Sequence, residues 1–483
     1  MNIYLIALLL YSIFLMALGI VMSRRVKNSA DYLVAGRSLG TTRLFATFLA
    51  ANIGAGSTVG ATGLGYRMGM SAWWWVGSAC IGTFLLSQFL GPKLWTIAKE
   101  HGLATLQDYL EFRYSKAVKV VISLLFWFGA LAILAGQLIA ISWILNTVAG
   151  IPKWQGCLIG GVVAIVYCTA GGMMSSSFVN MFELAVTMSG LLLAVPFALR
   201  ALGGWSHMHD MVLANTGSAE KTAALFSITG AGAHQLLAWI AILVPSFMVS
   251  PGLVQKVYGA RDVKTVRRGV GLNSLGQAIF AFVPPVLGLC AFAAMPHLAN
   301  PELALPTAMK SLLPEWLGVW TLASIFSAEL SATDAILFML STSLAVDLYK
   351  TFLNPGVTQQ KMLWVSRMAS IGAGIVGILL AMILPSIIQA VSIFYGLIAV
   401  ALFVPVLAGL YSKRVLSAAA LSSIFAALTA TVVTIRLTHG AGVGVLSPQA
   451  IGIATAAIVM IGFRIFAPSV PVPKASSMEE TLS

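Results

Sequence analysis

Three acidic residues lie inside long apolar stretches of the sequence, where ionisable side chains are rare: Glu183, Glu329 and Asp334. A carboxylate in an apolar environment is costly unless a cation or a proton neutralises it. Every Lys and Arg lies in a polar loop or near the end of an apolar stretch, which argues against buried ion pairs. We therefore expect a bound cation or a proton beside these carboxylates, although Glu329 could instead reach a water-filled edge.

Two hydroxyl groups accompany one of these acids. Ser327, Ser331 and Asp334 follow the spacing i, i+4 and i+7, which places them on one face of a helix. Hydroxyl and carboxylate oxygens at short range suit an alkali cation. The alternative is that the hydroxyls bond back to carbonyls of their own helix, which would leave Asp334 unexplained.

A cluster of glycines near residue 54 predicts an interrupted helix. The sequence AANIGAGST at residues 50–58 is followed by glycines at 60, 63 and 65. Glycine costs about 1 kcal/mol relative to alanine in a helix interior. Broken backbone at membrane depth survives only where protein or a water-filled cavity satisfies it, and its freed carbonyls can hold Na⁺. The alternative is close helix packing through small residues.

The composition indicates that membrane-spanning helices position these acidic and hydroxyl side chains. The chain of 483 residues is 59% hydrophobic and 9% charged, with mean hydropathy +0.93. Soluble domains carry about 25% charged residues, so a soluble enzyme, a disordered chain and a disulfide scaffold are excluded. Long apolar blocks, rather than alternating strands, exclude an outer-membrane barrel. The pattern predicts an all-α polytopic membrane protein with about thirteen spans, at residues 2–22, 43–66, 70–96, 118–148, 154–171, 176–199, 232–254, 270–296, 316–345, 362–386, 388–412, 415–437 and 447–466.

The basic residues are distributed unevenly between the two sides of this topology. The net charge is +13, and 22 of the 28 Lys and Arg residues fall in loops on one side. This asymmetry predicts an external N-terminus and a cytoplasmic C-terminus. The positive charge is therefore a topology signal, and no nucleic-acid partner is expected. We expect the chain in the cell (inner or plasma) membrane, with the lipid bilayer as its surroundings.

Several motifs occur in order along the chain. Residues 30–40 (ADYLVAGRSLG) precede the broken helix, in which residues 51–53 (ANI) are followed by the glycine cluster. Residues 171–175 (GGMMS), 251–269 and 347–350 (DLYK) follow. In this order the motifs resemble those of the sodium:solute symporter family, whose members carry proline, pantothenate, sugars and sialic acid. The resemblance covers about residues 30–350.

The resemblance implies a LeuT-like fold, with two inverted five-helix repeats and three flanking helices. Its expected divisions are a first helix and basic loop (1–42), a first repeat (43–199), an external loop (200–231), a second repeat (232–412), two further helices (413–466) and a cytoplasmic tail (467–483).

The resemblance also implies a sodium site between the second and ninth spans. Its ligands would be the carbonyls of Ala50, Ile53 and Ala328 and the hydroxyl of Ser331. The family usually has a second hydroxyl where this chain has Ala332. That departure leaves four ligands, admits a water, or lets the neighbouring Thr333 take the role.

A second departure concerns an additional sodium site that some family members use. Those members have an aspartate where this chain has Asn180, and the matching positions on the ninth span are Ser331, Asp334 and Ala335. The hypothesis is that Asp334 supplies the missing charge, helped by Asn180 and Glu183. The rival hypothesis is that Asp334 carries a proton.

Substrate in this fold sits at mid-membrane beside the broken helices, here the second and seventh spans. Val76 and Ala79 stand where the sugar carriers have hydrogen-bonding side chains, so a sugar is disfavoured. The candidate lining residues are Ser57, Thr58, Trp75, Gln137, Trp239, Ser250, Phe394 and Tyr395.

These observations predict a secondary active transporter for a small polar organic solute, driven by Na⁺ as coupling ion. The alternatives are a proton-coupled symporter of the same fold or a solute-sensing membrane protein. No nucleophile–base pair lies within a span, so no enzyme activity is expected, and no organic cofactor. A monomer is the working expectation.

Overall fold

The computed structural model describes residues 2–23, 29–168, 173–412 and 416–466. Part of the first basic loop, the glycines of the 171–175 motif, residues 413–415 and the expected tail from 467 lie outside the described residues.

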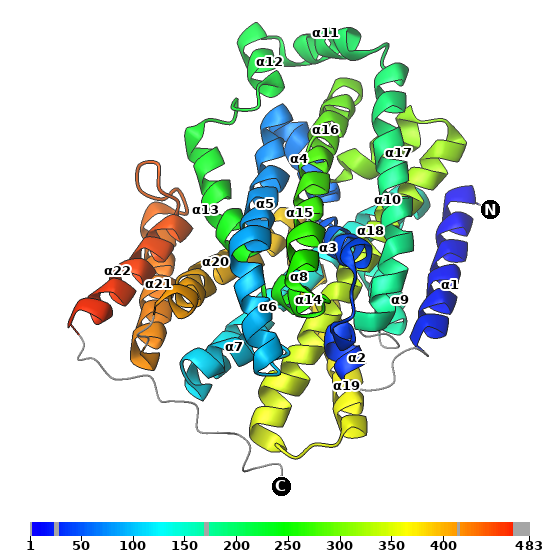
Figure 1. Cartoon of the computed structure of the whole chain (residues 1–483). Helices are drawn as coiled ribbons and strands as arrows, with labels where there is room; N and C mark the ends of the chain where they lie inside the picture. The colour runs from blue at the N-terminus through cyan, green and yellow to red at the C-terminus, as the bar shows by residue number, and fades with distance from the viewer. Residues whose placement is uncertain (1, 24–28, 169–172, 413–415, 467–483) are drawn as a thin grey trace.

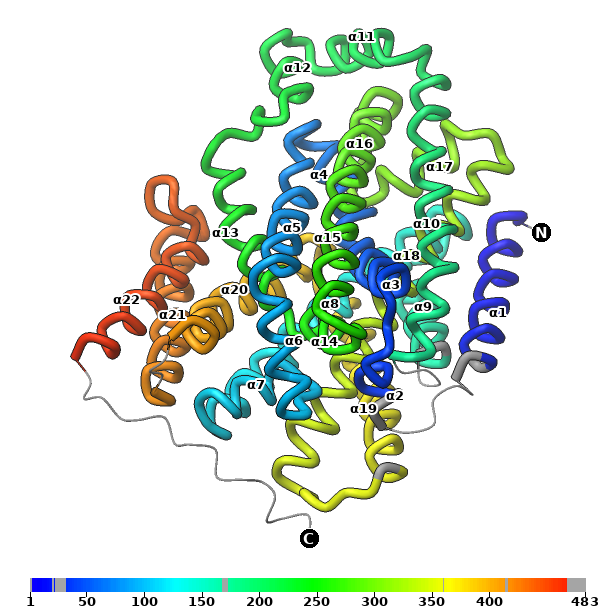
Figure 2. The backbone as a smooth tube through the Cα atoms, in the orientation of Figure 1, coloured from blue at the N-terminus to red at the C-terminus, as the bar shows by residue number. Residues whose placement is uncertain are grey.

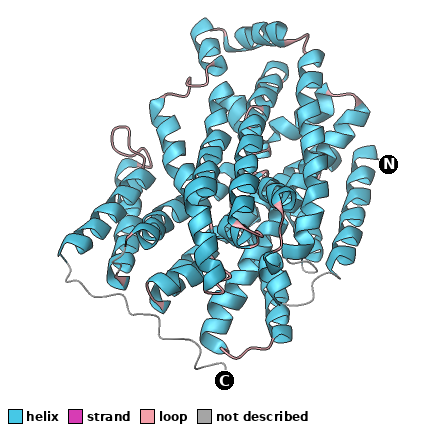
Figure 3. Cartoon of the chain, viewed as in Figure 1, coloured by secondary structure: helices cyan, strands magenta, loops and turns pink. Residues whose placement is uncertain are grey.

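Regular structure in the described ranges is helical throughout (Figure 3). The first half of the chain contains α1 (Ile3–Ser23), α2 (Ser29–Val34), η1 (Ala35–Arg37), α3 (Thr41–Asn52), α4 (Val59–Met68), η2 (Gly69–Ala72), α5 (Trp73–Leu85), η3 (Leu86–Leu90), α6 (Gly91–Glu100), α7 (Leu106–Arg113), α8 (Lys116–Ala149), α9 (Lys153–Cys168), α10 (Met173–Ala201), α11 (Trp205–Thr216) and α12 (Ala219–Phe226). The second half contains α13 (Ala233–Val249), α14 (Pro251–Tyr258), α15 (Val263–Phe280), α16 (Val283–Ala294), η4 (Pro301–Leu303), α17 (Ala304–Leu312), α18 (Glu315–Thr342), η5 (Ser343–Leu353), α19 (Gln359–Ile383), α20 (Ile387–Tyr411), α21 (Ser417–Thr438) and α22 (Pro448–Phe466).

Each of the thirteen predicted spans coincides with helical structure. Nine segments of the described chain are long and apolar enough to cross a membrane. The others are two shorter apolar helices, α1 and α9, and two interrupted segments, α3 with α4 and α5 with η3 and α6. The number thirteen, the orientation of the termini and the division into two repeats therefore stay predictions.

Two helices are interrupted at their middle, the first as the glycine cluster predicts and the second as the family resemblance implies. Residues 53–58 separate α3 from α4, and Ser250 separates α13 from α14. At the second break Pro251 occupies the first turn of α14, where its missing N–H costs nothing. Each break lies in the first helix of one of the two expected repeats.

The interrupted helices lie within the bundle, and the last two helices lie at its edge. In Figure 1, α1 stands at one side, α21 and α22 at the opposite side, and α11 with α12 across one end. The tube in Figure 2 shows α21 and α22 side by side, and both pack on α20. The external loop predicted at 200–231 thus folds as two short helices.

The two family-like loops meet at one end of the bundle. Leu39 N–H donates to Gly259 O at 3.0 Å, and Arg261 N–H donates to Leu39 O at 3.0 Å. The Arg37 guanidinium donates to the carbonyls of Tyr258, Ala98 and Leu103. This network holds the segment entering α3 against the segment leaving α14, and so positions both interrupted helices.

Candidate functional site

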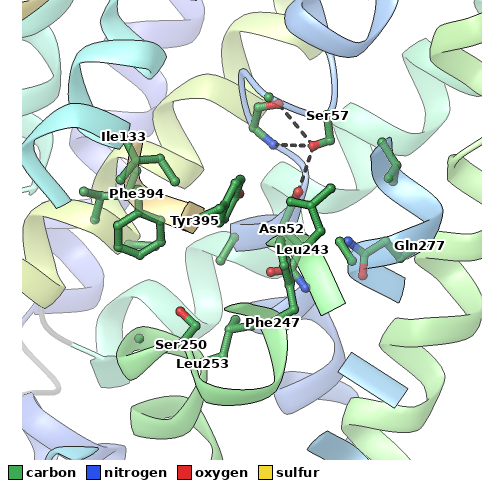
Figure 4. A pocket seen from close by; sticks show the side chains of 18 of the residues that line it. Asn52, Ser57, Ile133, Leu243, Phe247, Ser250, Leu253, Gln277, Phe394 and Tyr395 are labelled. Atoms are coloured by element: carbon green, nitrogen blue, oxygen red, sulfur yellow. Dashed lines mark hydrogen bonds between the residues drawn. The ribbon is translucent and has the colours of Figure 1, made fainter. Parts of the chain in front are cut away.

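A central cavity lies between the two interrupted helices and α5, α8 and α20. Its empty space is about 750 Å³, part of which is open to solvent. Figure 4 shows Phe394, Tyr395 and Ile133 on one wall and Asn52, Ser57 and Gln277 on another. Apolar walls with a few polar groups are typical of sites for small organic molecules.

Six of the eight residues predicted to contact substrate line this cavity. They are Ser57, Trp75, Gln137, Ser250, Phe394 and Tyr395. Two residues do not line it. Trp239 packs behind Trp75, with ring centroids 6.1 Å apart. Thr58 turns away toward α18. Val76 and Ala79, the positions that disfavour a sugar, line the cavity too.

Aromatic rings form one wall of the cavity. Trp75 Nε1 donates to Gly56 O at 2.8 Å, which ties α5 to the broken segment. Tyr395 lies against Phe247, with ring centroids 5.1 Å apart, and against Phe394 at 5.5 Å. Such tilted pairs are favourable beyond their buried area. The rings hold one another in place and present flat apolar surfaces to the cavity.

The break between α3 and α4 releases two particular carbonyls. In a continuous helix, the N–H groups of Gly54 and Ser57 would donate to the oxygens of Ala50 and Ile53. Here Gly54 N–H donates to Ser57 Oγ at 3.1 Å, and Ser57 N–H donates to Gly54 O at 2.9 Å. Ser57 Oγ in turn donates to Asn52 O, as Figure 4 shows. The diverted donors leave these two carbonyl oxygens, both predicted sodium ligands, available to a cation.

The predicted ligands on α18 are buried. Ala328, Ser331 and Ala332 are each at most 2% exposed. Ser331 Oγ lies 3.2 Å from the Asn180 amide of α10, so it does not bond back to its own helix. Thr333 does bond back, donating to Glu329 O at 2.6 Å, which gives no support to its replacing the missing hydroxyl.

The backbone at Gly54 approaches α18 so closely that position 332 must hold a small residue. A Cβ on Gly54 would lie 2.6 Å from Ala332 Cβ and 2.8 Å from Gln137 Oε1. The broken segment therefore approaches α18 more closely than a larger side chain at either position would permit. Gln137 Oε1 accepts from Ala55 N–H at 2.8 Å and supports the segment from α8.

The residues of the predicted additional site also meet. Asp334, Asn180 and Ala335 line a second, smaller cavity of about 320 Å³. Ser176 Oγ donates to Asp334 Oδ2 at 2.5 Å. The Asn180 amide is best satisfied with its nitrogen turned toward Ser176 O, Ser331 Oγ and Glu183 Oε2, each 3.2 Å away.

The assignment of one basic residue to a loop is wrong. The sequence pattern assigns Lys256 to a loop, so no buried ion pair is expected. In the structure Lys256 is 6% exposed on α14 and lines the same small cavity as Asp334, whose negative charge acts on it. Residues 251–258 form a buried helix rather than a loop because they continue the interrupted span.

The structure gives Glu329 a definite place. Its side chain is fully buried, and Thr58 Oγ1 donates to Glu329 Oε1 at 2.6 Å. The contact joins α18 to the start of α4, and the alternative of a water-filled edge is not met in this structure. Sequence reasoning also missed Asn52 and Gln277 as cavity residues, although polar side chains inside predicted spans were a visible signal.

Comparisons with known proteins agree on one family. A sequence model of the sodium:solute symporter family matches residues 32–426. The chain is 27% identical to "Uncharacterized symporter YidK" of Escherichia coli (strain K12), over 73% of this chain and 64% of that protein, which is less than two thirds of its length. It is 27% identical to the "Sodium/pantothenate symporter" of the same organism, over 81% of this chain and 82% of that one.

A further relative and a solved structure extend the comparison. The "Sodium/glucose cotransporter" of Vibrio parahaemolyticus is 23% identical over 83% of this chain and 78% of its own. The structure of a Na⁺-coupled sialic acid symporter superposes with a TM-score of 0.81 at 18% identity, over 98% of this chain and 99% of that one. The similarity to this solved structure, at 18% identity, supports the fold only.

Proposed function

The chain belongs to the sodium:solute symporter family, and we propose that it imports a small polar organic solute by symport with Na⁺. The protein is a multi-pass transporter of the plasma membrane and not an enzyme. The solute, the coupling mechanism and the site residues are the parts that we propose.

The proposed sodium site lies between the break of α3 with α4 and the middle of α18. Its ligands are the carbonyls of Ala50, Ile53 and Ala328 and the hydroxyl of Ser331, with Ala332 beside them. The observation that carries this assignment is the diversion of the Gly54 and Ser57 N–H groups from the first two carbonyls. Carbonyl and hydroxyl oxygens are suited to Na⁺.

The proposed solute site is the central cavity, which shares the broken segment with the sodium site. Asn52, Ser57 and Gln277 supply polar groups there, and Trp75, Phe394 and Tyr395 supply flat apolar surfaces. A solute of modest size with both polar and apolar parts fits this lining. Sodium and solute would each order the segment at 53–58, and so each would favour binding of the other.

The proposed cycle is alternating access. Sodium bound between the broken helix and α18 would tie these elements together in the outward-open state. Occupancy of both sites would then favour closure, inward opening and release into the cytoplasm by rocking of one helix group against the other.

The test is thermal stability of the purified full chain against a panel of small solutes, in Na⁺ and in K⁺. The panel holds amino acids, short carboxylates, vitamins, a sugar and a quaternary amine. We expect one class to raise the melting temperature in Na⁺ and not in K⁺. Flux of that solute into liposomes under an inward Na⁺ gradient would then follow.

Other outcomes would point elsewhere. Stabilisation by a solute that is equal in Na⁺ and K⁺ but changes with pH would favour proton coupling. Sodium-dependent binding without flux in liposomes would favour a sensor. Flux without sodium dependence would contradict the proposal.

A further inference from the structure

Lys256 is a buried cation placed among oxygen atoms. Its Nζ donates to Thr47 O on α3 at 3.1 Å. The small cavity that it lines is also lined by Asp334 of α18 and by Ser176 and Asn180 of α10. Ser176 Oγ holds the Asp334 carboxylate at 2.5 Å. The Lys256 side chain thus shares one cavity with a carboxylate, a hydroxyl and an amide from α18 and α10, and its ammonium donates to a backbone carbonyl of α3.

This set of groups is what a bound alkali cation would need at the same place. Hard oxygen ligands from several helices neutralise a monovalent cation inside a membrane protein. A buried carboxylate is stabilised by a positive charge nearby, and Lys256 is the basic residue that lines the same cavity as Asp334. A second cation at Asp334 would bring two positive charges against one carboxylate in a cavity where Asn180, Asp334 and Lys256 are each at most 6% exposed.

We propose that the Lys256 ammonium is a tethered cation that takes the place of an additional Na⁺ at Asp334. Asp334 then neither binds a second coupling ion nor carries a proton through the cycle. Under the proposed function, on which this part of the inference rests, Na⁺ enters only at the site of Ala50, Ile53 and Ser331.

The position of the pair gives it a mechanical role as well. Lys256 and Thr47 belong to the two interrupted helices, whereas Asp334 and Ser176 belong to α18 and α10. Rocking of one group against the other would strain the attraction between them. Because the ammonium is covalently held, it acts in every cycle without being transported, and the transporter moves one ion fewer per solute.

The test counts sodium ions on purified full-length protein by ²²Na⁺ saturation binding in a scintillation proximity assay. Lys256→Ala removes the tethered cation and leaves its oxygen ligands. We expect this variant to bind one more Na⁺ per chain than the unaltered protein. The double variant Lys256→Ala with Asp334→Asn is expected to return to the original number. Lys264→Ala, which removes an exposed positive charge from α15, is the control and is expected to change nothing.

The single variant Asp334→Asn provides a second test, whose result does not depend on whether Lys256→Ala folds. The proposal expects it to leave the number of bound Na⁺ unchanged. Loss of one Na⁺ in this variant would overturn the proposal, and so would no gain in a monodisperse Lys256→Ala protein. If the unaltered chain binds no Na⁺, the proposed sodium coupling fails, whereas the difference between Lys256→Ala and the unaltered chain still decides the role of Lys256.

Discussion

At the scale of single residues, hydroxyl groups in this protein divide into those that serve the backbone and those that face another helix. Ser57 accepts from Gly54 N–H and donates to Asn52 O, so it holds the broken segment open. Thr333 satisfies a carbonyl of its own helix. Ser331, two positions earlier on α18, faces α10 instead. Side chains of similar chemistry therefore have distinct roles that their types do not reveal.

The first prediction uses this difference. We expect Ser331→Ala to weaken Na⁺ affinity about tenfold or more, since it removes one of four proposed ligands, each worth about 1.4 kcal/mol or more. Thr333→Ala, on the same helix, is expected to change it less than twofold. Both are measured by Na⁺ titration of the melting temperature. Equal loss in the two variants would show that Thr333 supplies a ligand after all.

The second prediction concerns Glu302, a buried acid in the segment before α17. Burial raises its pKa above the ordinary value of 4.5, against the effect of the Ile387 and Trp143 N–H groups that donate to it. The folded protein therefore holds this proton to higher pH than the unfolded chain does. Its contribution to stability is fully present below about pH 4.5 and is lost as the pH rises through the raised value.

We therefore expect Glu302→Gln to flatten the fall in melting temperature that occurs as the pH rises above about 4.5, the ordinary carboxyl value. Glu220→Gln, at an exposed position on α12, is the control and should parallel the unaltered protein. Parallel profiles for all three proteins would contradict the assignment.

At the scale of elements, the broken helix depends on close approach to α18 and α8. A Cβ on Gly54 meets Ala332 and Gln137, so Gly54→Ala must push the segment outward. We expect a loss of about 1–3 kcal/mol in stability, together with weaker Na⁺ binding, because overpacking displaces the backbone that carries the ligands.

The control for this third prediction is Gly372→Ala on α19, where a Cβ meets nothing within 4 Å. A helical glycine with open space is expected to gain up to about 1 kcal/mol on replacement. Thermal melting with and without Na⁺ separates the two effects. An unaltered Na⁺ response in Gly54→Ala would mean that the segment does not carry the site.

The fourth prediction concerns the joint between α7, α8 and η5. Lys119 Nζ lies 2.8 Å from Asp108 Oδ1 and from Glu111 Oε2, and 4.0 Å from the fully buried Asp347. Lys119→Met leaves these carboxylates facing one another. We expect a loss of about 3 kcal/mol in stability, the lower end for a broken buried pair because Glu111 is half exposed.

Lys116→Met is the matched control, because Lys116 is exposed and one turn earlier on α8, and its contacts with Thr351 O and the Phe352 ring of η5 lie at the surface. Its removal is expected to change stability by about 0.5 kcal/mol or less. Melting temperatures in detergent compare the two variants. Similar shifts would show that charge removal on α8, and not the buried joint, sets the effect.

At the scale of the whole molecule, the proposed sodium and solute sites share the segment at 53–58, so binding at one is expected to affect binding at the other. The fifth prediction is therefore reciprocal. The factor by which solute tightens Na⁺ binding should equal the factor by which Na⁺ tightens solute binding, within the range of about 5 to 150 typical of coupled sites. Titration of each in the absence and presence of the other measures both factors. Factors of one in both directions would remove the basis for coupling.

The sequence by itself indicated the membrane class, the helical spans and the interrupted helix at Gly54, whereas the break in the seventh span was expected only from the family resemblance. The first three features depend on local composition: about 20 apolar residues span a bilayer, and clustered glycines weaken a helix wherever it packs. The ordered motifs indicated the family, and the resemblance to that family implied Ala50 and Ile53 as sodium ligands.

Only the tertiary structure decided which side chains meet. Thr58 follows Ser57 in the sequence, and Trp239 precedes Leu243 by one helical turn, but Thr58 donates to Glu329 and Trp239 packs against the ring of Trp75. The direction of each side chain follows the backbone geometry and the packing around it. Lys256 follows Pro251 by five residues and reads as a loop cation, yet packing of α14 against α3 and α18 buries it near Asp334. Charge pairing between helices far apart in the chain depends on their packing, which no local pattern encodes.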